Sequence, residues 1–224
     1  MLFKRLASHL PFAARQLLRA AKYRIELAAG RFQSDEPEFQ RLAELVNPGD
    51  WVLDVGANVG QYTLRFSELV GESGRVIAFE PIADTVEILA AMARLAPRRN
   101  ITLLNVAVSD RSGELRLRVP ANRDGLPDYF QSRVSDDGDE PVLSVALDDL
   151  NFPRRIALVK IDVEMHEVAV IRGMLKLIQR DRPILIIEGH EGIYPEFLRA
   201  FGYEFLPKAA GSPNLVFLPP DISR

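Results

Sequence analysis

Acidic and imidazole side chains gather at two points where short apolar stretches end. One stretch is LVKIDVEMHE and the other is PILIIEGH. Carboxylates and imidazoles can move a proton near neutral pH or ligate a divalent cation. If both stretches are parallel strands, their carboxyl ends meet at one edge of a sheet, where ligands bind. The candidate catalytic residues are Asp162, His166 and His190, and the candidate substrate contacts are Glu164 and Glu188.

Several roles remain open for these groups. Asp162, Glu164 and His166 alternate along the chain, so an extended segment would turn them toward one side. His166 or His190 is a candidate general base, although either imidazole could instead cap a helix. Asp162 and Glu188 could also hold magnesium or calcium, but no further ligand is identifiable and a metal is not favoured.

Two neighbouring charges are given structural roles. Glu167 is predicted to be a helix-start charge that the helix dipole favours. Lys160 lies inside an apolar stretch, where it either extends along the sheet or pairs with one of the carboxylates. Neither residue is assigned to catalysis.

A glycine-containing turn, DVGANVG, follows the first apolar stretch, and its glycines would let the backbone approach a ligand closely. Asn58 stands where a dinucleotide-binding turn has glycine, so the backbone of this turn would bind a pyrophosphate less closely. Asp54 offers a carboxylate to a cationic ligand. Glu80, 20 residues after Gly60, stands where a carboxylate takes two ribose hydroxyls. The pattern favours the sulfonium cofactor S-adenosylmethionine over NAD.

The elements that position these residues alternate between strands and helices. Strands are predicted at 51–56, 75–80, 101–108, 156–162 and 183–189, with a closing pair at 203–207 and 214–219. Helices are predicted at 62–70, 83–95, 168–179 and 193–202. Near-continuous apolar strands in this alternation predict an α/β fold with a doubly wound, mostly parallel sheet of about seven strands.

An insertion separates the third and fourth strands. Residues 114–119 and 141–147 alternate like the two half-exposed strands of a β-hairpin. The variable loop between them, 120–140, is long for a compact domain, which suggests that it helps choose the substrate. Its candidate contacts are Tyr129, Phe130 and Arg133.

Composition narrows the class of protein. The chain has 224 residues, 47% of them hydrophobic, and no cysteine, which excludes disulfides and thiolate chemistry and fits a cytoplasmic location. The net charge of −3 gives no reason to expect a nucleic-acid partner. A homo-oligomer stays open.

Basic residues are concentrated at the start of the chain. Residues 1–33 contain seven Lys or Arg and one acid, with apolar residues at roughly helical spacing. We predict a helical extension over 1–35 that precedes a single domain over 36–224. The favoured interpretation is a solvated helix packed on the domain; peripheral contact with an anionic membrane is the alternative.

The strand-end motifs together resemble those of FkbM-type methyltransferases. The motifs are VLDVGANVGQYT, VIAFEP, NVAVSD, LDDL, LVKIDVEMHE and PILIIEGH, in that order, and the similarity covers roughly residues 36–218. The resemblance implies a Rossmann-like sheet whose last strand runs antiparallel, and S-adenosylmethionine as methyl donor. It also implies an O-methyltransferase acting on a hydroxyl of a sugar, glycan, glycolipid or polyketide.

The resemblance also assigns individual residues. Gly56, Asn58 and Gly60 would line the methionine and ribose portions of the cofactor, and Glu80 would hold the ribose. Residues flanking the adenine or near its amino edge would be Ala107, Val108, Ser109 and Asp110. The family usually has glycine where Met165 stands. A positive φ there would cost a methionine about 1 kcal/mol or more, and otherwise its side chain could narrow the acceptor pocket.

Two other classes of function compete with a methyltransferase. An NAD-dependent oxidoreductase is disfavoured by Asn58 and by the lack of a Tyr-x-x-x-Lys hydride relay. A non-catalytic, membrane-associated scaffold that retains the fold would use the basic extension as its working part.

Overall fold

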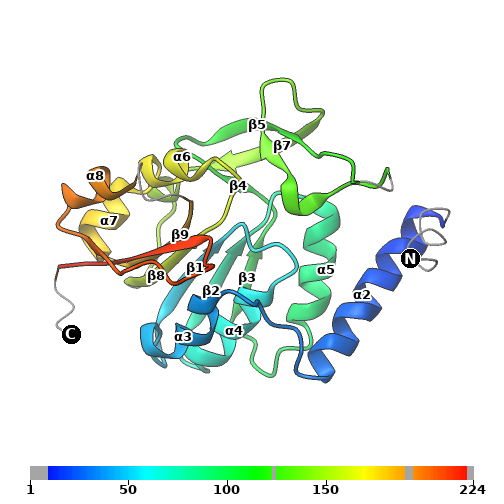
Figure 1. Cartoon of the computed structure of the whole chain (residues 1–224), viewed down its shortest axis with the longest axis horizontal. Helices are drawn as coiled ribbons and strands as arrows, with labels where there is room; N and C mark the ends of the chain where they lie inside the picture. Colours follow the sequence, from blue (N-terminus) through cyan, green and yellow to red (C-terminus); the bar gives the residue numbers. More distant parts are fainter. Residues whose placement is uncertain (1–9, 123–124, 190–193, 221–224) are drawn as a thin grey trace.

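The computed structural model describes residues 10–122, 125–189 and 194–220, and it has the mixed α/β architecture predicted above (Figure 1). A large sheet runs through the centre, helices cover both of its faces, and a smaller sheet lies against one edge. The sequence-predicted fold class is confirmed.

The main sheet has seven strands in the order β10-β11-β9-β8-β1-β2-β3. Its members are β1 (Trp51–Val55), β2 (Arg75–Phe79), β3 (Ile101–Leu104), β8 (Ile156–Ile161), β9 (Ile184–Glu188), β10 (Glu204–Phe205) and β11 (Asn214–Leu218). β11 is antiparallel to both of its neighbours, and the other pairs are parallel. Consecutive strand residues are buried on opposite faces, which is why these stretches are apolar almost throughout.

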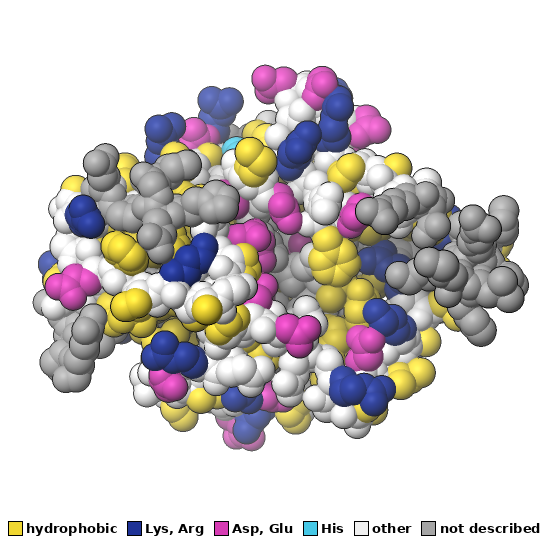
Figure 2. Space-filling model, in the orientation of Figure 1, with side chains coloured by type: hydrophobic (Ala, Val, Ile, Leu, Met, Phe, Trp, Pro, Cys, Tyr) yellow, Lys and Arg dark blue, Asp and Glu magenta, His cyan; other side chains and the backbone are white. Residues whose placement is uncertain are grey.

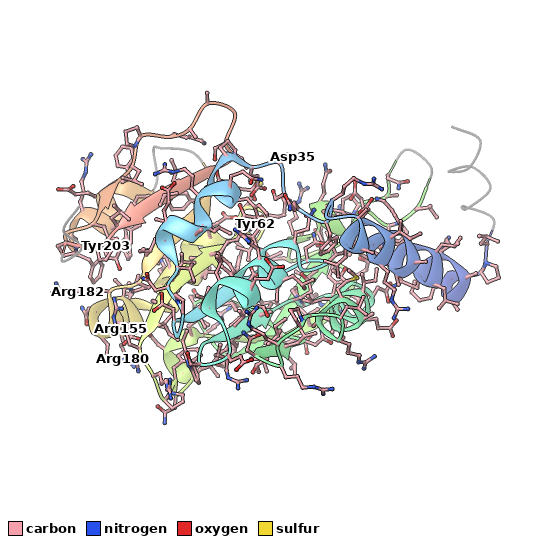
Figure 3. The ribbon with its side chains drawn as sticks, turned by 90° about the horizontal axis from the view of Figure 1, so that it is seen from below. Asp35, Tyr62, Arg155, Arg180, Arg182 and Tyr203 are labelled. Carbon is pink, nitrogen blue, oxygen red and sulfur yellow. The ribbon has the colours of Figure 1, made fainter. Side chains whose placement is uncertain are left out.

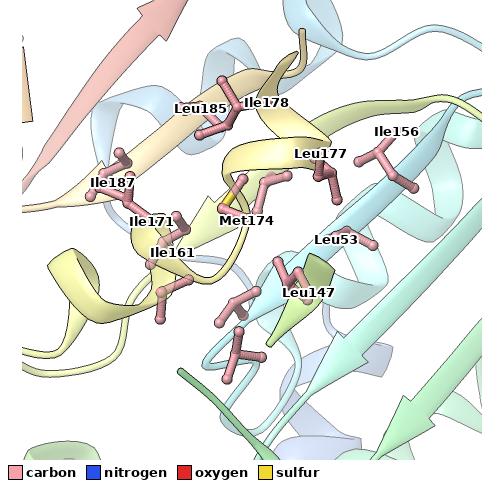
Figure 4. Packing of buried hydrophobic residues seen from close by; sticks show 14 of the residues in the cluster. Leu53, Leu147, Ile156, Ile161, Ile171, Met174, Leu177, Ile178, Leu185 and Ile187 are labelled. Atoms are coloured by element: carbon pink, nitrogen blue, oxygen red, sulfur yellow. The ribbon is translucent and has the colours of Figure 1, made fainter. Parts of the chain in front are cut away.

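Each face of the sheet has its own helical layer. On one face lie α3 (Pro37–Leu45), α4 (Gln61–Val70) and α5 (Ala83–Ala93), and on the other α6 (Glu167–Arg172), α7 (Leu175–Asp181) and α8 (Tyr194–Arg199). Figure 4 shows the second layer, where Ile171, Met174 and Ile178 meet Leu185 and Ile187 of the sheet. These layers fix the strand ends on which the candidate site is built.

The inserted segment forms a second sheet with the order β4-β7-β5-β6. Its strands are β4 (Ala107–Val108), β5 (Gly113–Arg118), β6 (Arg133–Val134) and β7 (Glu140–Val145). The predicted hairpin is confirmed as the antiparallel pair β5 and β7. The predicted single strand 101–108 is wrong: the chain leaves the main sheet after Leu104, and Asn105 donates to the carbonyls of Glu80 and Pro81 at 2.9 and 2.8 Å.

The predicted helix 168–179 is also two helices. They separate at Gly173, whose backbone lies so close to Ser109 that a Cβ would be 1.9 Å from the Ser109 carbonyl oxygen. Asp148 then accepts the N–H groups of Lys176 and Leu177, both at 2.9 Å, at the start of α7. The cap comes from a distant segment, so local periodicity could not reveal it.

The basic N-terminal stretch contains the helix α2 (Phe12–Ala28), which lies beside α5. Gln16 Nε2 donates to the carbonyl oxygen of Asp84 at 3.0 Å, and Tyr23 packs edge-on against Phe32 at 5.6 Å. The helix is therefore attached to the domain, although the boundary between residues 35 and 36 stays a prediction. Among the described helices, none combines the length and hydropathy needed to cross a bilayer.

Candidate active site

The turn after β1 depends on glycine at two positions. Gly56 has φ +80°, and a Cβ there would lie 1.8 Å from the main-chain oxygen of Asp162. Gly60 has φ +98°, and its Cβ would lie 2.3 Å from Leu89. The left-handed backbone disfavours larger residues at both positions, and the close approach to main-chain atoms also excludes them at Gly56. The turn thereby brings the ends of β1 and β8 together.

Glu80 is buried immediately after β2 and faces this turn. Its Oε2 accepts the backbone N–H of Asn58 at 2.9 Å and its Oε1 accepts the N–H of Ile82 at 3.0 Å. Burial raises the pKa of Glu80 to about 7, against the opposing effect of the two N–H donors. Each oxygen keeps a second lone pair, so the carboxylate can still accept two hydroxyl groups.

Asp54 is fully buried at the end of β1. Thr63 donates to its Oδ2 at 2.5 Å, whereas Oδ1 has no hydrogen-bond partner in the described part of the chain. Burial raises the pKa of Asp54, and the Lys160 ammonium opposes that rise. An unpartnered buried oxygen is costly unless a ligand supplies a donor. The ammonium group of a methionine moiety would be such a donor, so this residue fits S-adenosylmethionine.

Lys160 is the buried cation of this region. Its Nζ lies 2.7 Å from Asp162 Oδ2 and 4.4 Å from the ring centre of Tyr62, and its side chain is 2% exposed. Burial lowers the pKa of Lys160, but the nearby carboxylates of Asp162 and Asp54 raise it further. The pairing role predicted for Lys160 is therefore observed. Figure 3 shows Tyr62 in the middle of the molecule, far from the arginines at the α7 end.

We expect Lys160→Met to lower the free energy of unfolding by about 3–5 kcal/mol at pH 7.5, because it leaves buried Asp54 and partly buried Asp162 without their cation. Urea denaturation measures the loss, and Lys176→Met, at an exposed position on α7, is the matched control with an effect below about 0.5 kcal/mol. The loss should shrink on acidification because protonation removes the unpaired charge. Equal unfolding free energies for the two variants would contradict the role assigned to Lys160.

Three carboxylates converge beyond Lys160. One oxygen each from Asp162, Glu164 and Glu188 lies within 4.8 Å of the other two. A hydrogen bond to Asp162, together with burial, raises the pKa of Glu188 to about 9. Burial and the charges of Asp162 and Glu167 raise the pKa of Glu164. The raised pKa of Glu188 favours a proton between Glu188 and Asp162, and the Lys160 ammonium lies on the other side of Asp162. A divalent cation held by the three carboxylates is the alternative.

His166 lies at the start of α6, and its Nε2 is 2.9 Å from the hydroxyl oxygen of buried Ser109. Partial burial lowers its pKa below the usual 6.5, although Asp110 and Glu167 oppose this. The imidazole is therefore neutral at physiological pH. A neutral imidazole at a cavity wall can accept a proton.

Glu80, the three carboxylates and His166 line one cavity of about 360 Å³, which is within the size range of ligand pockets. Figure 2 shows the hollow on this face, with acidic side chains on one side and hydrophobic ones on the other. The sequence-predicted residues that line it are Gly56, Asn58, Glu80, Ala107, Val108, Tyr129, Phe130, Asp162, Glu164, His166 and Glu188. A smaller adjoining cavity of about 160 Å³ is lined by Asp54 and Gly60.

Other sequence-predicted residues lie elsewhere. Ser109 is buried beside His166 and Asp110 is exposed. Neither residue lines the larger cavity. Arg133 lines a neighbouring groove instead. Met165 has φ +75° and is 86% exposed, so the strained conformation is real and its side chain does not narrow the cavity. His190 lies outside the described residues.

Glu36 and Tyr62 belong to the site but could not be assigned to it from the sequence. Glu36 lines both cavities and accepts a hydrogen bond from the Tyr62 hydroxyl. Burial and this bond raise the pKa of Tyr62 above its ordinary value. Glu36 precedes α3 and is 18 residues from the glycine turn, so only tertiary packing brings it here.

The family model described as Methyltransferase FkbM domain matches residues 54–206. The chain belongs to the FkbM methyltransferase family. The match spans the glycine turn, Glu80 and the whole acid cluster, so the resemblance seen in the strand-end motifs is confirmed for this FkbM domain. No curated protein matches the chain.

Solved structures share the fold of this FkbM domain. The FkbM methyltransferase of Methylobacillus flagellatus KT has a TM-score of 0.54 and 16% identity, covering 81% of this chain and 50% of that one. The chain thus spans half the length of that relative. Two further structures are more distant. A SAM-dependent O-methyltransferase of Thermotoga maritima has 12% identity and a TM-score of 0.49, covering 89% of this chain and 71% of that one. An rRNA methylase of Streptococcus thermophilus also has 12% identity and a TM-score of 0.49, covering 82% of this chain and 95% of that one.

Proposed function

We propose that this chain is an S-adenosylmethionine-dependent O-methyltransferase. The observation that carries the proposal is Glu80, a buried carboxylate facing the glycine turn with acceptor capacity left for a vicinal diol. Asp54 would take the ammonium group, while Ala107 and Val108 would flank the adenine. Membership of the family favours this function over an NAD-dependent oxidoreductase.

In the proposed reaction, a hydroxyl oxygen of the acceptor bonds to the methyl carbon as the carbon–sulfur bond breaks, and the hydroxyl proton leaves. The cofactor supplies the electrophilic methyl group. His166 would accept the proton, and Asp162 and Glu164, which line the same cavity, would orient the acceptor. Holding both reactants in line can supply roughly 7–11 kcal/mol, more than a base contributes.

The remaining features of function stay predictions. A sugar, glycan, glycolipid or polyketide hydroxyl is the proposed acceptor, with no nucleic-acid partner. A cytoplasmic location, peripheral membrane contact and a homo-oligomer are further proposals, and the non-catalytic scaffold is the alternative.

Calorimetry with S-adenosylhomocysteine tests the cofactor assignment, and pH sharpens the test. Because the ionised form of Glu80 accepts the ribose and its pKa is about 7, affinity should fall by up to about tenfold from pH 8 to pH 6. Glu188→Gln, which removes another titrating group from the same cavity, should retain this dependence. No binding at high micromolar concentration, or a pH-independent affinity, would count against the proposal.

A further inference from the structure

A second cavity of about 410 Å³ lies between α2 and the loop of the insertion. Much of its lining is apolar, with Phe12, Leu18 and Tyr23 from the helix facing Leu126 and Pro127 of the loop. Nothing in the proposed transfer of a methyl group uses this cavity. It is large enough for several methylene groups, whose burial is favourable at about 0.8 kcal/mol each.

Among the described residues, three cations line the helical side of this cavity, namely Arg15, Arg19 and Lys22. They recur at intervals of four and three residues, so they share one side of α2. Lys22 pairs with Glu26 at 3.5 Å, whereas neither arginine forms a salt bridge with a described residue. Asp128 is the one acid among the described lining residues. The cavity therefore combines an apolar interior with a net positive rim.

The cavity adjoins the candidate active site. Tyr129 and Phe130 line both spaces. Tyr129 is held by a hydrogen bond to Asp84 and by Arg19, whose guanidinium lies 5.2 Å from the ring centre. In Figure 2, the hydrophobic wall of the central hollow is followed on its outer side by basic side chains. The two cavities therefore share a wall that is formed by these two aromatic residues.

We propose that this second cavity binds the apolar chain and the phosphate of an amphiphilic acceptor, whose hydroxyl-bearing end enters the active site. The inference rests on the proposed methyltransferase function and narrows its acceptor to an anionic, lipid-linked molecule. Arginine and lysine side chains suit a phosphate, since charge-assisted hydrogen bonds are about twice as strong as neutral ones. The apolar interior suits the chain next to it.

The outward side of α2 offers the competing explanation. Leu17 and Ile25 are 72% and 64% exposed and do not line the cavity. A helix that simply adsorbs to lipid would use these residues and every nearby cation alike. Paired variants on the two sides of α2 therefore separate a bound ligand from surface adsorption.

Calorimetry on the full chain uses monomeric decyl phosphate as the probe, with decanol and inorganic phosphate as the half-ligands. Decyl phosphate should bind at least about tenfold more tightly than either, because it alone fills both parts of the cavity. Arg15→Gln with Lys22→Gln should weaken its binding about tenfold, and Leu18→Ser should also weaken it. The matched controls, Arg24→Gln and Leu17→Ser, should leave the affinity unchanged.

Equal losses in the controls, or equal affinity for decanol and decyl phosphate, would overturn the proposal. Thermal melts identify any variant that fails to fold. S-adenosylhomocysteine binding is measured on the same samples: if it persists while decyl phosphate fails to bind, the second cavity is refuted and the methyltransferase assignment stands. If S-adenosylhomocysteine fails to bind, the methyltransferase assignment fails.

Discussion

Replacing Glu80 with alanine should weaken S-adenosylhomocysteine binding by roughly 10²–10⁴-fold. A hydrogen bond to a charged group contributes about 1.5–3 kcal/mol, so losing two ribose hydroxyls costs roughly 3–6 kcal/mol. The carboxylate is buried and already holds the N–H groups of Asn58 and Ile82, so its position is fixed before the ligand arrives. Calorimetry measures the change directly.

The matched control for this variant is Glu87→Gln, which removes an exposed acid from α5 and should leave the affinity within about twofold. Alanine at position 80 also frees the two backbone N–H groups, so a thermal melt of the unliganded protein must accompany the binding measurement. A folded Glu80→Ala protein that binds S-adenosylhomocysteine as the wild type does would refute the ribose assignment.

Replacing His166 with glutamine should slow methyl transfer by about 10²–10⁴-fold while leaving S-adenosylhomocysteine affinity within about twofold. The neutral imidazole lines the cavity and is oriented by the Ser109 hydroxyl at 2.9 Å. Glutamine retains a polar group of similar reach, but it cannot take up a proton. The measurement is methyl transfer from labelled S-adenosylmethionine to a hydroxyl acceptor under single-turnover conditions.

The pH profile distinguishes a base from a positioning group. The pKa of His166 lies below 6.5, so the wild-type rate should be constant near neutrality and fall when acidification protonates the imidazole. His166→Gln should lack this acidic limb. Ser109→Ala, which removes only the orienting hydroxyl, should slow transfer less and keep the limb. An unchanged rate or pH profile in His166→Gln would rule out His166 as the base.

Much of the fold follows from local patterns. The apolar strands, the closing strand pair and the hairpin could each be predicted, because hydrophobic periodicity is a property of neighbouring residues. The antiparallel direction of the last strand was implied only by the resemblance to FkbM-type methyltransferases. The two errors have a common cause. The strand break after Leu104 and the helix break at Gly173 depend on contacts with Glu80 and Ser109, which periodicity cannot register.

The sequence by itself determined which chemical groups stand at the strand ends. The alternation of strands and helices predicts a parallel sheet, and the carboxyl ends of its strands place Gly56, Glu80 and Asp162 at one edge. Only the tertiary structure decided how those groups behave. It buried Asp54 with one oxygen that has no partner among the described residues, paired Lys160 with Asp162, and set the insertion loop against α2 to form a second cavity. Charge state and cavity shape depend on desolvation and on packing between distant segments, and neither is a property of a local stretch of chain.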